Sequence, residues 1–292
     1  DLRMSRGLGD VYKRQVQERA ELIMLSDIAG YVGADTCGCL LAIRQDQQEE
    51  ISLMIDIGTN GEMVLGNRER MVTCSTAAGP AFEGAKIECG MRGAAGAVDH
   101  VKYEDGKWNY TTVGNKPAVG LCGSGLIDLV AGLLDAGMLD ENGVLRSGQE
   151  KQGVFILVLP ERGGNERGVY LTQKDLGEVQ LAKAAIAAGI QMLMERLGIT
   201  EDDICSVYIA GAFGNYMDPV SAGKIGLFPA TLVKKVKPVG NAAGEGAKIA
   251  LVNEKEMLEM DELVRKIEFV ELAASADFQD HFIDELGFET GE

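Results

Sequence analysis

Residues 51–62 have the sequence ISLMIDIGTNGE, an apolar run that leads into an acid and a turn rich in glycine, hydroxyl and amide groups. The apolar run is typical of a buried strand. In the turn at 58–61, backbone N–H groups suit phosphate oxygens without a side-chain charge. Asp56 at the strand end suits Mg²⁺ held through water, because that ion keeps most of its hydration shell. The stretch therefore predicts a strand ending in a phosphate loop.

The residues after this loop continue a meander. Residues 62–67 and 70–76 are predicted to form the second and third strands, with the turn around Asn67. The glycine-rich segment 77–88, AAGPAFEGAKIE, is predicted to lead into a helix. Residues 97–113 indicate another hairpin, because Asp105-Gly106 accepts the positive φ angles of a tight turn.

Helices and strands then alternate along the chain. Small and apolar residues over 28–43 predict a closely packed helix, and a glycine loop opens a second helix within 120–137. A third helix is predicted over 180–198, and it ends at a glycine, as the second does. A strand over 206–215 and a strand, glycine loop and helix over 236–253 complete the pattern. The fold class is therefore α/β, with a mixed sheet flanked by helices.

Composition and charge narrow the class of function. The 292 residues carry a net charge of −17 without clustered Lys and Arg, which argues against nucleic acid as a partner. No stretch reaches the apolar length of a membrane span and no leader pattern is present, so we expect a cytoplasmic protein without membrane contact. Six scattered cysteines are expected to be reduced, and Cys37-Gly38-Cys39 to be a small packing face of a helix.

The two ends of the chain carry separate expectations. Residues 1–15, DLRMSRGLGDVYKRQ, lack an initiator Met at their start, and DVYKRQ resembles a translated sequencing adapter, so we exclude them as non-native. The natural sequence is then expected to begin near Val16, inside a longer gene. Residues 254–292 carry −10 of the net charge and predict a solvated acidic helix pair. A docking surface for a basic partner is the alternative.

Four glycine loops, at 58–61, 123–125, 211–214 and 240–246, follow strand-like segments or precede helices. Ligands bind at such places in α/β sheets. Taken alone, a Gly-Ser-Gly before a helix is typical of a close-packed helix start, and one glycine pair is a weak signal. The four loops together are a stronger signal for a nucleotide site, and the sequence contains neither a Walker motif nor a complete Rossmann motif that would suggest a different one.

Five motifs in order, DIGTNGE, STAAGPAFEG, CGSGLIDL, YIAGAFGN and VGNAAGEGA, resemble the C-terminal domain of the reductive activators of corrinoid proteins. These are ATPases of the acetate and sugar kinase, Hsp70 and actin (ASKHA) superfamily. The resemblance implies a ribonuclease-H-like fold in which ATP lies between two lobes. Residues 16–50 would be a remnant of the first lobe with a connecting helix, 51–253 the second lobe, and 254–292 an acidic C-terminal segment.

The resemblance also implies roles for single residues. Asp56 would be catalytic and would hold Mg²⁺, and Glu83 would orient the attacking water; the alternative for Glu83 is a helix N-terminal acid stabilised by the macrodipole. The other residues implied to contact the phosphates or adenosine of ATP are Gly58, Thr59, Asn60, Gly61, Gly79, Gly123, Ser124, Gly125, Gly211, Gly214, Asn215, Gly240 and Asn241.

For the intact protein, the resemblance implies an ATP-dependent reductive activase of anaerobic metabolism. A [2Fe-2S] cluster in an N-terminal ferredoxin domain would return a Co(II) corrinoid to Co(I). The partner would be a corrinoid iron-sulfur protein or the corrinoid subunit of a methyltransferase, and the activator itself would be a homodimer. Because the first phosphate loop belongs to the other lobe, this chain alone is expected to be inactive.

Two other functions stay open at this point. One is the ATPase activator of a 2-hydroxyacyl dehydratase or benzoyl-CoA-type reductase, in which a [4Fe-4S] cluster lies on cysteines. Cys74 and Cys89 have suggestive positions, yet Cys74 is two residues farther from its Ala-Ala-Gly than that pattern requires. The other is a non-catalytic lobe that serves only for docking through the acidic tail.

Overall fold

The computed structural model describes residues 24–146, 153–211, 214–273 and 275–288; the expectation for residues 1–15 lies outside them. Its main sheet has the order β10-β9-β1-β2-β3-β11. Strands β1 to β3 form an antiparallel meander, and β9 and β10 run parallel to β1, which is the expected ribonuclease-H-like arrangement. The strands are β1 (Ile51–Ile57), β2 (Gly61–Gly66), β3 (Met71–Thr76), β9 (Ile204–Ala210), β10 (Val236–Gly240) and β11 (Glu268–Phe269).

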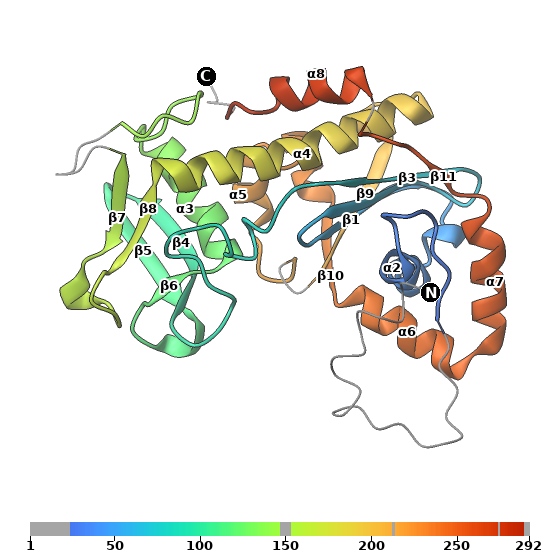
Figure 1. Cartoon of the computed structure of the whole chain (residues 1–292), viewed down its shortest axis with the longest axis horizontal. Coiled ribbons are helices and arrows are strands. Elements are labelled where there is room, and N and C mark those ends of the chain that lie inside the picture. The colour runs from blue at the N-terminus through green and yellow to red at the C-terminus, as the bar shows by residue number, and fades with distance from the viewer. Residues whose placement is uncertain (1–23, 147–152, 212–213, 274, 289–292) are drawn as a thin grey trace.

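Both faces of this sheet are covered, which explains the apolar run of β1. Leu53 and Ile55 belong to the core beneath α4 (Gln173–Leu197), whereas Met54 points into a second core with α2 (Ala34–Ile43). Helices α6 (Ala242–Val252) and α7 (Glu254–Val264) complete that second side. Figure 1 shows α4 running along one face of the sheet, with α2, α6 and α7 on the other.

Two small sheets lie at the end of the molecule opposite α7 (Figure 1). The first has the order β5-β4-β6 and the second pairs β7 with β8. The predicted Asp105-Gly106 turn joins β4 to β5 with positive φ at both residues. The hairpin of β7 and β8 was not predicted. The elements here are β4 (Ala97–Glu104), β5 (Lys107–Thr112), β6 (Gly120–Leu121), α3 (Gly123–Asp135), β7 (Val154–Val158) and β8 (Val169–Thr172).

Helix α4 begins earlier than the pattern indicated. It starts at Gln173 rather than near Gln180, because the side chains of Thr172 and Asp175 form a reciprocal capping box at its first turn. It ends, as predicted, at Gly198 in the left-handed conformation. Helix α8 (Ala276–Asp284) packs along α4, and the short α5 (Pro219–Lys224) packs against α3.

Three further observations concern the helix predictions. The helix expected over 28–43 begins only at Ala34, because residues 28–32 form a tight turn closed by the Ile28 amide on the Val32 carbonyl. Residues 77–90 form consecutive turns rather than a helix, with positive φ at Gly79 and Gly84. The packing face predicted at 37–39 is confirmed: a β-carbon at Gly38 would stand 2.7 Å from the Ala243 carbonyl oxygen on α6.

No helix in the described ranges is long and apolar enough to cross a membrane.

Candidate functional site

Asp56 lies at the carboxyl end of β1, paired with Glu62 on β2 and with Ala210 on β9. The residue after Ala210 is Gly211, and a β-carbon there would stand 3.1 Å from Oδ1 of Asp56. On the other carboxylate oxygen, the Cys39 thiol of α2 donates a weak hydrogen bond at 3.7 Å. The sheet therefore brings Asp56, which precedes the turn at 58–61, against Gly211, which begins the turn at 211–214.

Three carboxylates share this region. Burial raises the pKa of Asp56, and the charge of Asp35 in the first turn of α2 raises it further. Burial, followed by repulsion from Asp35 and Asp56, raises the pKa of Glu62 to about 7. Asp35 and Glu62 were not predicted as site residues. Glu62 stood within the DIGTNGE motif, and Asp35 approaches only through the packing of α2 on the sheet.

The turn at 58–61 is joined to the segment that follows β3. The Gly58 amide donates to the Asn60 carbonyl at 2.9 Å, and the Gly79 amide donates to the Thr59 carbonyl at 2.8 Å. The Thr59 hydroxyl donates to Oε1 of Glu83 at 3.1 Å. Glu83 therefore stands beside the loop. The alternative role for Glu83, an acid at a helix N-terminus, is wrong because no helix forms there.

Gly61 completes the turn by close packing. A β-carbon at Gly61 would stand 2.9 Å from the Thr76 hydroxyl and 3.1 Å from the Ile186 side chain of α4. The end of the loop is therefore fixed between β3 and α4.

The predicted adenosine residues gather at the ends of β9 and β10. The Gly211 amide donates to the Gly240 carbonyl at 2.9 Å, and both glycines have positive φ. A β-carbon at Gly240 would stand 2.8 Å from Nδ2 of Asn215. Asn241 caps α6 by accepting from the Gly244 amide at 3.0 Å. Gly214 packs against Ile209, where a β-carbon would stand 2.6 Å from its side chain; residues 212 and 213 lie outside the described ranges.

The Gly123-Ser124-Gly125 turn belongs to a different part of the fold. The buried Ser124 hydroxyl donates to the Asp99 carbonyl at 2.8 Å. At Gly125 a β-carbon would collide with the Val98 carbonyl oxygen, so α3 packs directly on β4. Close packing accounts for these residues, and their contact with a nucleotide stays a prediction.

The three acids supply carboxylate oxygens, the ligand type that a hydrated cation takes. Within the described residues, no three His, Cys, Asp or Glu side chains converge closely enough to hold a metal ion. Asp35, Asp56 and Glu62 nevertheless concentrate negative charge in a partly buried place, and carboxylate oxygens are what Mg²⁺ prefers. A Mg²⁺ ion bound through water, as predicted for Asp56, suits this donor set.

Cys74 and Cys89 face different neighbours. The Cys74 thiol is fully buried and lies 3.9 Å from the Gly189 carbonyl on α4, whereas Cys89 is half-buried and lies 4.0 Å from the Gly168 carbonyl. Burial raises the pKa of both thiols. These surroundings favour neutral packed thiols over ligands of a shared cluster.

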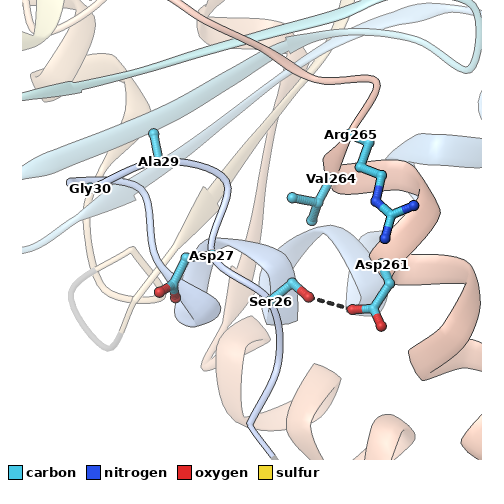
Figure 2. A pocket seen from close by; sticks show the side chains of 7 residues that line it. All are labelled: Ser26, Asp27, Ala29, Gly30, Asp261, Val264 and Arg265. Atoms are coloured by element: carbon cyan, nitrogen blue, oxygen red, sulfur yellow. Dashed lines mark hydrogen bonds between the residues drawn. The ribbon is translucent and has the colours of Figure 1, made fainter. Parts of the chain in front are cut away.

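A separate hollow lies between residues 26–30 and α7. Figure 2 shows Ser26 hydrogen-bonded to Asp261 there, with Arg265 nearby, directly after the end of α7. None of the predicted site residues lines it.

Comparison with known proteins relates this chain to activators of corrinoid proteins. Residues 50–292 match the family described as the C-terminal domain of RACo, the ASKHA domain. The corrinoid activation enzyme RamQ of Eubacterium limosum is 37% identical, over 88% of this chain and 45% of its own length. The [Co(II) methylated amine-specific corrinoid protein] reductase of Methanosarcina barkeri is 28% identical, over 96% of this chain and 54% of its own.

Among solved structures, a reductive activator for corrinoid, iron-sulfur protein superposes with a TM-score of 0.84 and 39% identity, covering 90% of this chain and 44% of that one. The chain thus spans about half the length of the relatives it matches.

Proposed function

The chain belongs to the family of the C-terminal domain of RACo, the ASKHA domain, and we propose that it is the ATPase part of an enzyme that reductively activates corrinoid proteins. The observation that carries this proposal is the contact between Asp56 and Gly211, which joins the predicted phosphate turn to the predicted adenosine turn. Because a nucleotide carries its phosphates and its adenosine in one molecule, the two turns must lie close together to bind it.

In the proposed site, the Thr59 and Asn60 backbone amides hold phosphate oxygens, since the Gly58 amide donates within the turn. Gly211, Gly240 and Asn215 form the adenosine side. Glu83, oriented by the Thr59 hydroxyl, positions the attacking water. Asp56 holds Mg²⁺ through water, and Glu62 and Asp35 add negative charge. The metal would neutralise charge that develops on the transferred phosphoryl group. ATP and water yield ADP and phosphate in this step.

The rest of the intact protein supplies the electron. We propose that a [2Fe-2S] cluster outside this chain gives one electron to Co(II) of a corrinoid protein, which becomes Co(I). Hydrolysis is coupled to this transfer if ATP binds two arrangements of the lobes with different affinity. The proposed partner is a corrinoid iron-sulfur protein or a methyltransferase corrinoid subunit, the activator is a homodimer, and both work in the cytoplasm.

The test uses the full-length parent enzyme and its Asp56→Asn variant. Reactivation is followed by the absorbance change as Co(II) corrinoid becomes Co(I) in the presence of a reductant and ATP. We expect the variant to lose ATP-dependent reactivation while an external donor still reduces its cluster. Asp277→Asn is the matched control, because Asp277 is an exposed acid that lines a different hollow together with Glu195 and Glu268. Reactivation by Asp56→Asn at the wild-type rate would remove Asp56 from the mechanism.

A further inference from the structure

A groove with a cavity volume of about 1160 Å³ runs between β5 and the β7-β8 hairpin. Trp108, Tyr110 and Tyr170 line it together with apolar side chains of β7 and of Leu159. Tyr110 is 38% exposed and Leu159 is 50% exposed, so large apolar surface faces solvent here. None of the residues proposed to bind ATP belongs to its lining.

Trp108 is the only tryptophan of the chain and is held in a fixed position. Its ring lies 4.8 Å from that of Tyr103 and 4.9 Å from that of Phe155, measured between centroids. Gly132 of α3 leaves room for it, since a β-carbon there would stand 2.8 Å from the indole. A rigid aromatic side chain in a groove is typical of a residue that contributes strongly to protein binding, because little conformational entropy is lost.

The charge of the groove is opposite to that of the molecule. Two basic residues, Arg162 and Arg167, line it. The single acid in the lining, Glu88, accepts a hydrogen bond from the Tyr170 hydroxyl at 3.2 Å. On a chain of net charge −17, this lining favours an acidic segment.

The groove lies at the far end of the molecule from the first described residues (Figure 1). The first described residues pack beside α7, where Ser26 bonds to Asp261, and Figure 1 shows β5 and β7 at the opposite end of the molecule.

We propose that the groove binds an acidic segment of the corrinoid protein, with a large apolar side chain of that segment against Trp108. This inference rests on the proposed function for the identity of the partner. Arg162 and Arg167 would pair with carboxylates of the segment, and Tyr110 and Leu159 would cover its apolar side chain.

The experiment compares full-length enzyme with its Arg162→Glu/Arg167→Glu variant for binding to an immobilised, purified corrinoid iron-sulfur protein at low and high salt. We expect affinity to fall at least tenfold, with a weaker salt dependence than the wild type, while ATP hydrolysis without the partner is unchanged. Arg68→Glu/Lys255→Glu makes the same change of net charge at two exposed ion pairs elsewhere. This control should bind as the wild type does.

Several outcomes would overturn the proposal. Equal affinity of the groove variant and wild type, or equal loss in the control, would show that the groove is not the binding surface. The fluorescence of Trp108 is obtained by subtracting the emission of the Trp108→Phe variant from that of the wild type. Acrylamide should quench this fluorescence in the free enzyme. If it does not, the indole is shielded from solvent and another part of the enzyme fills the groove. Dimers that dissociate only in the groove variant would identify a second copy as the occupant. If wild-type enzyme binds but fails to reactivate, the proposed function is wrong rather than the groove.

Discussion

Gly211 at the end of β9 lies directly against Asp56 at the end of β1, with 3.1 Å between Oδ1 and the position that a β-carbon would occupy. The two residues are 155 positions apart by their numbers, and parallel pairing of β1 with β9 brings them together. Because Gly211 also donates to the Gly240 carbonyl, the contact extends across three strand ends.

Gly211→Ala is predicted to weaken ATP binding by the full-length enzyme roughly tenfold, about 1.4 kcal/mol. The added carbon meets the Asp56 carboxylate, and the φ of 91° at this position strains any residue with a side chain. Calorimetric titration with MgATP measures the affinity. Gly177→Ala, where a β-carbon meets nothing within 4 Å, is the control. Unchanged affinity at a lowered melting temperature would give Gly211 a structural role only.

Glu62 makes the stability of the chain depend on pH. Its folded pKa of about 7 lies above the ordinary 4.5, so the folded state binds the proton more tightly. The stabilisation is complete below pH 4.5 and is lost as pH rises through about 7. Glu62→Gln should therefore flatten the fall in melting temperature between pH 5 and 8. Because the carboxylate is partly exposed, we expect on the order of 1 kcal/mol, or about 2–4 °C. Identical pH profiles would contradict the placement of Glu62 among these acids.

The crossing of α2 and α6 should not accept a side chain at Gly38. A β-carbon there would stand 2.7 Å from the Ala243 carbonyl oxygen, a backbone atom that cannot rotate away. Gly38→Ala is expected to destabilise the fold by about 1–3 kcal/mol, as other overpacked cores do. Thermal unfolding measures this, and Gly30→Ala, with open space around its β-carbon, should have little effect. Equal melting temperatures of Gly38→Ala and the wild type would mean that α2 and α6 move apart without loss of stability.

The capping box at Thr172 should matter more than the similar one at Thr200. Both hydroxyls lie in reciprocal caps, but the first begins a 25-residue core helix and the second a turn of 3 residues. Thr172→Ala is predicted to lower stability by about 1 kcal/mol. Denaturant titration of both variants compares them, and a larger loss for Thr200→Ala would reverse this ranking.

This chain alone is predicted to hydrolyse ATP far more slowly than a full-length relative. The resemblance assigns a first phosphate loop to the other lobe, and the chain spans 44% of the solved activator. Phosphate release from the two proteins, measured side by side with MgATP, tests this. Comparable turnover would mean that the turn at 58–61 suffices.

The helices and strands that were predicted correctly are those whose residue pattern allows a single interpretation. An apolar run ending in Asp-Ile-Gly could only be a strand that leads into a turn, and it placed Asp56 correctly at the end of β1. The segment 77–90 was ambiguous, because its glycines suit both a helix start and consecutive turns. The capping box of α4 was readable as Thr-x-x-Asp and was missed. Asp35 gave no local signal, since only tertiary packing brings α2 to the sheet.

Helix α4 links the two regions for which a function is proposed. Its first turn follows β8 beside the groove, and farther along it Ile186 packs on Gly61 while Gly189 lies against Thr76. At 25 residues it is a rod of about 37 Å. A shift of its groove end would therefore also move the base of the predicted phosphate turn, which is how the proposed docking would be coupled to the proposed hydrolysis.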